Sequence, residues 1–197
     1  MKKLFPHLAL KRLLPIIGAL LLTMNTHAAD KIIFDFQTVT NPAAWQVVND
    51  DVMGGVSASS WRLTNGVAVF QGELSRANNG GFASVRSLPA PLDFAGGDTL
   101  IIRVRGDGRR YKFTARMDHS FDSAIYQAVF MTKKDDWEEH RLPLKGFVPS
   151  FRGRVLIGEL PLDPARVVSV GFLIADKQSG PFRLEIAWIK AEAPARR

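Results

Sequence analysis

The sequence predicts an all-β protein, built as an antiparallel β-sandwich or jelly roll. After residue 30, apolar and polar residues alternate with a period of two along much of the chain, which is the pattern of a half-buried strand. Clusters of glycine, proline, asparagine and aspartate divide this region into about ten short runs. No amphipathic stretch is longer than about three helical turns. Short strands at regular spacing are typical of sandwiches and jelly rolls.

The first 29 residues are expected to form a cleavable signal peptide. Residues 1–12 are basic, residues 13–24 are almost wholly apolar, and small residues follow at 26–29. The apolar run of 12 residues is shorter than the roughly 18 to 20 that a membrane-spanning helix needs. We therefore expect a periplasmic or otherwise exported protein with no stable membrane insertion after signal cleavage. An uncleaved N-terminal anchor is the alternative. A mitochondrial presequence fits less well, because such segments are amphipathic and rich in Arg and Ser.

Residues 30–190 are expected to form a single β-sandwich domain, followed by a C-terminal tail at 191–197. The first strand-like run, 32–36, is rich in isoleucine and phenylalanine, and a short helix is expected near 41–45. Three further runs with strand character follow, at 57–63, 67–74 and 81–87.

The middle of the chain predicts a β-hairpin. Residues 100–105 and 110–117 both alternate, and the Gly106-Asp107-Gly108 sequence between them accepts the positive φ of a tight turn. In such a hairpin, basic side chains would form a stripe on one outward face. The stripe would consist of Arg103, Arg105, Lys112 and Arg116. It is either an ordinary solvated face or a contact surface for an acidic partner, an anionic glycan or lipid head groups.

The C-terminal part of the domain predicts the remaining strands. Three runs with strand character lie at 124–131, 137–142 and 167–174. In the last run, 182–188, Trp188 has the same phase as Phe182, Leu184 and Ile186. This phase places Trp188 in the core.

Charge and cysteine content exclude several classes of function. The chain has 26 Lys and Arg against 19 Asp and Glu, a net charge of +7. Four of the basic residues lie in the first 29, so the remainder has 22 basic against 19 acidic residues, or +3. This balance argues against a nucleic-acid partner. Since the chain contains no cysteine, a disulfide scaffold, a zinc–thiolate site and a thiol nucleophile are excluded.

Two glycine-rich turns carry the candidate site. Segment 49–57 places two neighbouring carboxylates before a Gly-Gly turn, and segment 75–86 places two asparagines before another. A rigid β scaffold presents the residues of such turns to a ligand or partner. The candidate ligand- or partner-binding residues are Asp50, Asp51, Met53, Ser57, Asn78, Asn79 and Arg86. The alternative is a purely structural corner, in which Asp and Asn bond nearby backbone N–H groups.

No catalytic residue, cofactor or metal site is expected. Asp50 and Asp51 are adjacent, so on a strand they would point to opposite faces and could not flank one bond. The sequence contains no nucleophile elbow, phosphate loop or dinucleotide fingerprint. The alternative is a hydrolase whose carboxylates converge only in the fold, with Asp50 or Asp51 near Arg86 and Asp176.

Five blocks of the sequence resemble the complex I intermediate-associated protein 30 family. They are DDVMGGVS at 50–57, FQGELS at 70–75, NNGGFASVR at 78–86, FVPSFRGR at 147–154 and SVGFLIADKQSGPF at 169–182. The blocks occur in order along nearly the whole predicted domain. The resemblance implies a galactose-binding-like jelly roll, a fold shared with many carbohydrate-binding modules. It also implies a non-enzymatic role, because the mitochondrial members are chaperones for the assembly of respiratory complex I.

The expected function is that of an exported, non-catalytic accessory protein with a protein partner, such as an assembly factor for an envelope or respiratory complex. A carbohydrate-binding module for a periplasmic or cell-wall glycan is the alternative. Tryptophans exposed together on one sheet face would favour the alternative, because sugar rings stack on such side chains.

Overall fold

The computed structural model describes residues 30–39, 41–94, 96–120 and 123–193. The expected signal peptide at residues 1–29 lies outside the described residues, as do residues 194–197 of the expected tail. Within the described ranges, no helix has the length and apolar character needed to cross a membrane.

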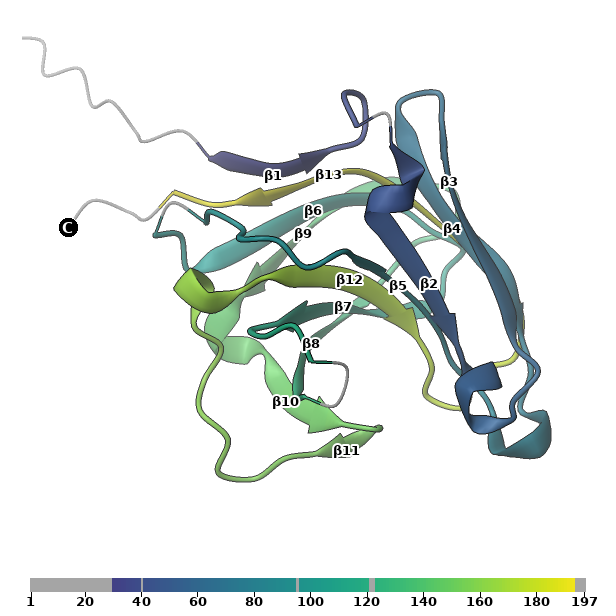
Figure 1. The fold of residues 1–197 in the computed structure, drawn as a ribbon. Helices are drawn as coiled ribbons and strands as arrows, with labels where there is room; N and C mark the ends of the chain where they lie inside the picture. Colours follow the sequence, from purple (N-terminus) through teal and green to yellow (C-terminus); the bar gives the residue numbers. More distant parts are fainter. Residues whose placement is uncertain (1–29, 40, 95, 121–122, 194–197) are drawn as a thin grey trace, which may run out of the picture.

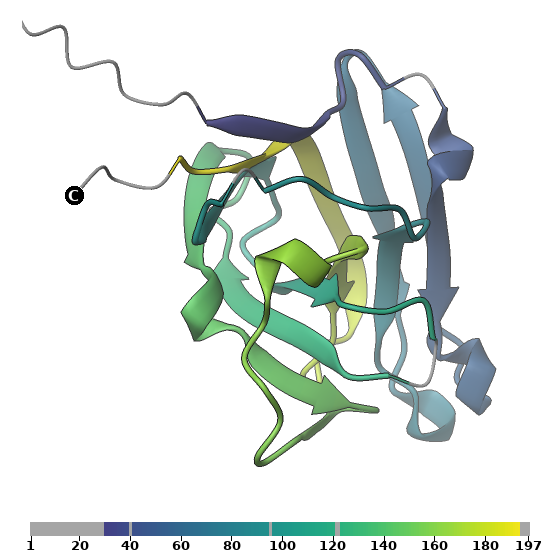
Figure 2. The same cartoon turned by 60° about the vertical axis from the view of Figure 1, so that its left-hand side comes forward.

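Two antiparallel sheets face each other (Figures 1 and 2). The first sheet has the order β3 (Ala58–Thr64), β4 (Val67–Leu74), β13 (Gly180–Ala191), β6 (Thr99–Arg105) and β9 (Trp137–Pro143), with β1 (Lys31–Asp35) also paired to β13. The second has the order β11 (Arg154–Val155), β10 (Val148–Phe151), β8 (Ile125–Met131), β7 (Arg110–Arg116), β12 (Ser169–Ile174), β5 (Ala83–Ser87) and β2 (Trp45–Asn49). Short 3-10 turns connect some of the strands: η1 (Pro42–Ala44), η2 (Asp50–Met53), η3 (Ala77–Asn79), η4 (Leu144–Gly146) and η5 (Pro164–Arg166).

The core lies between the two sheets, as the alternation predicts. Leu100, Ile102 and Val104 of β6 are fully buried, and Tyr111 and Phe113 of β7 are buried from the other sheet. Removing this apolar surface from water is the main favourable term in folding. The predicted all-β antiparallel sandwich is therefore confirmed.

The predicted hairpin between β6 and β7 is wrong. β6 pairs with β9 and β13, whereas β7 pairs with β8 and β12 in the other sheet. The glycine-rich turn therefore carries the chain across the sandwich, which lets each strand bury its apolar face against the opposite sheet. Arg103 and Lys112 consequently lie on the outer faces of different sheets, and the predicted basic stripe does not exist.

Trp188 points outward, contrary to the phase of its run. The register of β13 shifts between Ile186 and Trp188, so one extra residue reverses the direction of the side chains that follow. Ile186 and Ile189 are both buried, while Trp188 is half-buried on the outer face opposite Arg103. The bulge is therefore the reason that the core prediction for Trp188 is wrong.

The sequence-based expectation lacks three short strands and places a helix where the structure has a 3-10 turn. Strands β2, β10 and β11 were not expected, since each is short and interrupted by polar residues or proline. The short helix expected near residue 41 is the turn η1, in which the Asn41 Oδ1 atom accepts a hydrogen bond from the Ala43 N–H at 2.9 Å. At the other end, β13 continues to the buried residue Ala191.

Candidate functional site around Asp50

The two glycine-rich turns meet at one end of the sandwich. Both carry the chain from the second sheet to the first or back: η2 connects β2 to β3, and η3 connects β4 to β5. Figures 1 and 2 both place these two turns side by side. We call residues 49–57 and 75–82 the Asp50 corner, because Asp50 joins the two segments.

The Asp50 carboxylate accepts hydrogen bonds from both segments of the corner. Its Oδ1 atom accepts from the Ser57 N–H at 2.9 Å. Its Oδ2 atom accepts from the Ser57 hydroxyl at 2.6 Å, the Gly81 N–H at 2.6 Å and the Phe82 N–H at 3.3 Å. The side chain is only 1% exposed. These four neutral donors satisfy a charge that would otherwise be costly to bury.

The same hydrogen bonds fix the protonation state of Asp50. Burial raises the pKa of a carboxyl group because it disfavours the charged form. The hydrogen bonds from the Ser57 side chain, Gly81, the Ser57 N–H and Phe82 outweigh burial and hold the pKa of Asp50 below its ordinary value. Asp50 is therefore ionised at neutral pH.

Two glycines are required because they pack directly against this carboxylate. A Cβ atom on Gly55 would lie 2.3 Å from Asp50 Cγ, and one on Gly80 would lie 2.5 Å from Asp50 Oδ2. Neither glycine has a positive φ. Glycine is therefore required at these positions because a side chain would clash with Asp50, and not because of the backbone conformation. This contact explains one glycine of each Gly-Gly pair; the other two, Gly54 and Gly81, have φ values of 85° and 123° that favour glycine.

Ser57 and Asn78 extend the network around the corner. The Ser57 hydroxyl accepts a hydrogen bond from the Ser75 N–H at 3.0 Å while it donates to Asp50. The Asn78 amide donates to the Gly54 carbonyl at 3.2 Å. Asn78 and Asn79 have left-handed φ values of 54° and 60°, which asparagine tolerates better than most residues. The side chains of Asp50, Ser57 and Asn78 therefore join the two segments of the corner.

The outer surface of the corner carries three exposed apolar side chains among polar ones. Val52 and Met53 are 68% and 67% exposed, and Val56 beside them is also exposed. Asp51 is exposed next to them, with its Oδ1 atom accepting from the Val52 N–H at 3.1 Å. Of these residues the sequence analysis singled out Asp51 and Met53 but not the two valines. Their position in a loop between polar turn residues is the signal that could have identified them.

Arg86 is not part of the corner. It is half-buried on β5, opposite Gly171 and Gln46 of the neighbouring strands. Burial, and then the nearby charge of Arg116, lower the pKa of Arg86 to about 10, so the guanidinium stays charged at neutral pH. Asp176 forms an ion pair with Lys112 at 2.6 Å. The structure therefore brings together six of the seven candidate residues, without Arg86.

The geometry favours a structural role for Asp50 over a catalytic one. Its two oxygens are already engaged by four donors, and the adjacent Asp51 faces solvent. A general base or nucleophile must instead reach the reacting atom of a substrate. Among the described residues, no group of three or more His, Cys, Asp or Glu side chains is placed to hold a metal ion.

The fold is a jelly-roll β-sandwich of the galactose-binding-like class. A family 11 carbohydrate-binding module from Clostridium thermocellum has a TM-score of 0.60 and 14% identity, over 87% of this chain and 99% of that chain. An agarase has a TM-score of 0.59 and 13% identity, over 86% of this chain and 25% of that chain. At these identities the similarity shows the fold alone.

The family model described as complex I intermediate-associated protein 30 matches residues 34–186, and the chain belongs to this family. The mitochondrial protein of that name from Mus musculus is 29% identical over 180 residues, which cover 81% of this chain and 55% of the relative. The one from Drosophila melanogaster is 30% identical over 186 residues, covering 82% and 62%. The chain thus matches a little more than half the length of these relatives.

The expected periplasmic or otherwise exported location is contradicted by these comparisons. The relatives from mouse, Drosophila, Caenorhabditis and Neurospora are all named as mitochondrial proteins or probable ones. The expectation came only from charge and hydropathy in residues 1–29, and targeting segments for different compartments share part of that pattern.

Proposed function

We propose that this protein is a non-catalytic accessory protein that binds another protein through the outer surface of the Asp50 corner. The names of its relatives describe association with a complex I intermediate, which makes such an intermediate the first candidate partner. One observation carries the proposal: Val52, Met53 and Val56 are exposed on a loop that the buried Asp50 carboxylate holds in place.

The corner suits a protein contact for two physical reasons. Apolar surface that is exposed in the free protein gains free energy when a partner removes it from water, at about 25 cal/mol per Å². A loop that is already fixed also loses less conformational entropy on binding than a mobile one. The unbranched Met53 side chain can adapt to an irregular partner surface.

The experiment compares two matched pairs of serine substitutions. Val52→Ser/Met53→Ser removes the apolar surface of the corner, whereas Val129→Ser/Met131→Ser removes a similar pair on β8, where both residues are 55% exposed. Tagged full-length chains are crosslinked in cells, and the captured proteins are identified by mass spectrometry. We expect the corner variant to lose a protein, complex I subunits being the first candidates, that the wild type and the β8 variant retain. Equal capture by all three chains would contradict the proposal.

Glycan binding is the second candidate, favoured by the position of two tryptophans. Trp137 and Trp188 are half-buried on the outer face of the first sheet. Their rings already face cations: the Lys190 ammonium lies 4.0 Å from the Trp188 ring centroid and the Arg105 guanidinium 5.1 Å from that of Trp137. A sugar would compete with these contacts, which is why we rank this function second. Calorimetric titrations with a panel of glycans test it, and heats abolished by Trp137→Ala would support it.

A further inference from the structure

A second candidate surface lies on the β10–β11 hairpin, at the edge of the second sheet opposite to the Asp50 corner. β11 is the last strand at one edge of this sheet, and β2, which leads into the corner, is the last at the other. Figures 1 and 2 both show the hairpin and the loop after it at the lower margin of the molecule. No residue of the Asp50 corner takes part in this surface.

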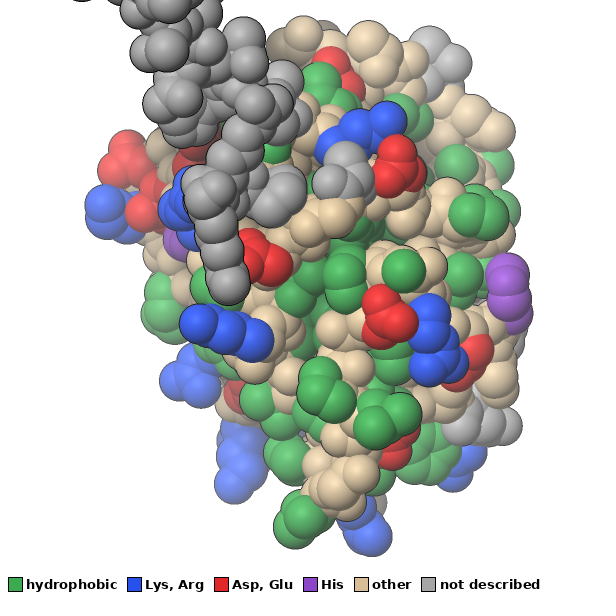
Figure 3. Space-filling view, turned by 90° about the vertical axis from the view of Figure 1, so that its left-hand side faces the viewer, with side chains coloured by type: hydrophobic (Ala, Val, Ile, Leu, Met, Phe, Trp, Pro, Cys, Tyr) green, Lys and Arg blue, Asp and Glu red, His purple; other side chains and the backbone are tan. Residues whose placement is uncertain are grey.

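The hairpin exposes three apolar side chains. Val148 on β10 is 46% exposed, Val155 on β11 is 64% exposed, and Ile157 just after β11 is 99% exposed. Ser150 pairs with Val155, so Val148 and Val155 lie on the same side of the hairpin, because side chains two residues apart share a face. Figure 3 shows hydrophobic and basic side chains at the lowest margin of the molecule. Apolar side chains exposed together indicate a contact surface more strongly than single ones do.

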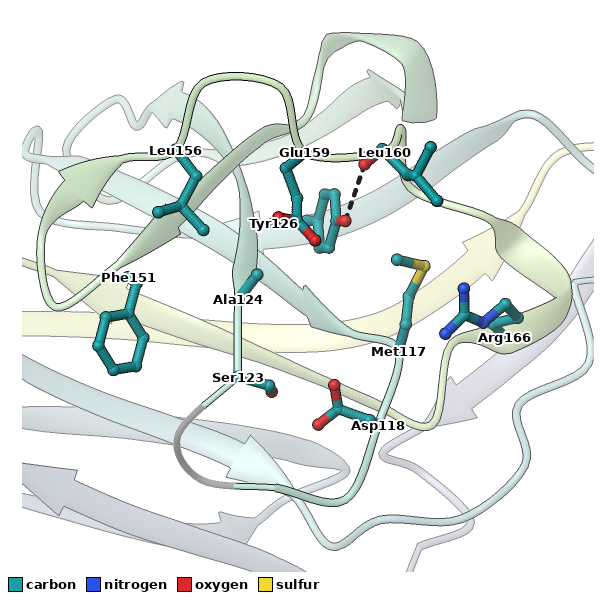
Figure 4. A pocket seen from close by; sticks show the side chains of 10 residues that line it. All are labelled: Met117, Asp118, Ser123, Ala124, Tyr126, Phe151, Leu156, Glu159, Leu160 and Arg166. Atoms are coloured by element: carbon teal, nitrogen blue, oxygen red, sulfur yellow. Dashed lines mark hydrogen bonds between the residues drawn. The ribbon is translucent and has the colours of Figure 1, made fainter.

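The hairpin is fixed to the body of the protein on its other side. Phe151 and Leu156 line a pocket of about 470 Å³ together with residues of β8 and of the loop after the hairpin (Figure 4). The Leu156 N–H donates to the Pro149 carbonyl at 3.0 Å, and the Tyr126 hydroxyl donates to the Leu160 carbonyl at 2.8 Å. The exposed side chains therefore project from a fixed frame, which reduces the entropy lost on binding.

The charged residues of the hairpin are all basic. Residues 148–157 contain Arg152 and Arg154 and no acid, and the neighbouring strand β8 has no charged residue. The first acid after the hairpin, Glu159, points into the pocket (Figure 4), and residues 160–166 contain one acid and one base. In the described part of the chain, the Arg154 side chain forms no ion pair or hydrogen bond. The hairpin therefore presents guanidinium groups beside apolar side chains.

Arg152 occupies a turn position that asparagine fills elsewhere in the molecule. Arg152 and Gly153 have φ values of 48° and 78°, and Asn65 and Gly66, in the turn between β3 and β4, have φ values of 49° and 76°. Asparagine and glycine are the residues that a left-handed hairpin turn favours. The turn alone therefore does not account for an arginine at position 152, whose guanidinium lies 5.1 Å from the Phe151 ring centroid.

We propose that the β10–β11 hairpin forms a peripheral contact with an anionic phospholipid bilayer. Val155 and Ile157 enter the boundary between head groups and acyl chains, and Arg152 and Arg154 bind lipid phosphates. The long arginine side chains reach the head groups while their aliphatic parts stay beside apolar neighbours. A bilayer is favoured over an acidic protein segment because its phosphate and acyl layers match guanidinium and aliphatic groups that lie side by side. This contact goes beyond the proposed function and uses other residues.

The test uses a fluorescent label, which the absence of cysteine makes site-specific. Ile157→Cys in the full chain is labelled with the environment-sensitive dye nitrobenzoxadiazole, and Val52→Cys at the Asp50 corner is labelled in a second chain. Each chain is titrated with vesicles of phosphatidylcholine alone, or of phosphatidylcholine and phosphatidylglycerol in equal amounts. We expect a blue shift of the emission from position 157 with the anionic vesicles only, and no shift from position 52. No shift at position 157, or the same shift at both positions, would overturn the proposal.

Matched variants separate the charges of the hairpin from net charge. In the chain labelled at position 157, Arg152→Asn/Arg154→Gln removes both guanidiniums and places at 152 a residue that the turn accepts. We expect this chain to need at least fivefold more anionic lipid for half of the spectral shift. Lys133→Gln/Lys134→Gln removes the same net charge beyond the opposite end of β8, where both lysines are exposed, and should change this amount less than twofold. Equal effects of the two pairs would overturn the proposal.

A valine on each surface tests the apolar part of the contact. In the chain labelled at position 157, Val155→Ser should raise the amount of lipid needed at least twofold, whereas Val52→Ser, which is similarly exposed, should not. Equal effects of these two substitutions would show that the hairpin does not enter the bilayer. If position 157 never responds while Val52→Ser/Met53→Ser loses its protein partner, the lipid proposal alone is wrong. If position 157 responds while the corner variant captures the same proteins as the wild type, the lipid contact holds and the corner contact is wrong.

Discussion

Asp50 links two segments that are far apart in the chain, since its donors Ser57 and Phe82 lie 7 and 32 residues away. A buried carboxylate with several neutral donors is stabilised chiefly by those hydrogen bonds. The sequence analysis could identify the residue from its turn context. It could not predict the partners, because nothing in segment 49–57 indicates that segment 75–86 folds against it.

Asp50→Asn should lower the free energy of unfolding by about 2–4 kcal/mol at pH 7. The amide NH2 replaces one of the two acceptor oxygens, so it would face either the Ser57 N–H or the Gly81 and Phe82 N–H groups and leave them without an acceptor. Because the folded-state pKa of Asp50 is depressed, its charge stabilises the fold above the unfolded-state pKa of about 3.9. This contribution is lost as the pH falls through the folded-state pKa. Urea denaturation at pH 7 and pH 3 checks both points.

The control for this prediction is the exposed neighbour. Asp51→Asn should change the free energy of unfolding by no more than about 0.5 kcal/mol, as is usual for surface substitutions. If Asp51→Asn destabilises the protein as much as Asp50→Asn, the assignment of the buried carboxylate is wrong.

Gly80→Ala should lower the free energy of unfolding by about 1–3 kcal/mol, because the added methyl would overlap Asp50 Oδ2. Gly146→Ala is the control, since a Cβ atom there would have no other heavy atom within 4 Å, and a change within about 0.5 kcal/mol is expected. Thermal or urea unfolding measures both. A tolerated Gly80→Ala would show that the carboxylate is not fixed where the structure places it.

Among the elements, β13 shows how a local pattern can mislead. The strand pairs with β4 through its first half and with β1 through its second. Residues 185–191 also pair with β6, and the register of this pairing shifts between Ile186 and Trp188. The sequence shows a regular alternation through residue 188, and a bulge depends on the partner strand, which the sequence alone does not reveal. The β6–β7 error has a similar cause, because a glycine-rich turn fits both a hairpin and a crossing between sheets.

Two substitutions in β13 test the bulge directly. Ile189→Ser should lower the free energy of unfolding by about 3–5 kcal/mol, since it leaves a cavity and buries a hydroxyl. Trp188→Ser should cost about 1 kcal/mol or less, because this ring lies outside the core and loses chiefly its contact with Lys190. Urea denaturation ranks the two variants. If Trp188→Ser destabilised the protein more than Ile189→Ser, the alternation would continue through residue 188 and β13 would have no bulge there.

At the scale of the whole molecule, the fold class was predictable because period-two alternation is a local property of each strand. The division of the strands between two sheets was not, because it depends on contacts between distant segments. The same distinction applies to the site. Six of seven candidate residues share one corner, but their polar groups serve the fold, and the exposed valines beside them form the surface that we propose for binding.

The relatives from mouse and Drosophila are named for association with a complex I intermediate, and such an intermediate is the first candidate partner that we propose. The substituted residues of the corner, Val52 and Met53, are exposed and do not belong to the core, which allows binding to be measured apart from stability.

The most direct test of the central claim is site-specific photocrosslinking in cells. Met53 is replaced by p-benzoylphenylalanine in one chain, and Met131, the matched exposed methionine on β8, is replaced in another. The account predicts a discrete crosslinked protein from position 53 that is absent from position 131. It also predicts that this product disappears when Val52→Ser is added. No product from position 53, or the same product from both positions, would contradict the claim that the Asp50 corner presents a protein-contact surface.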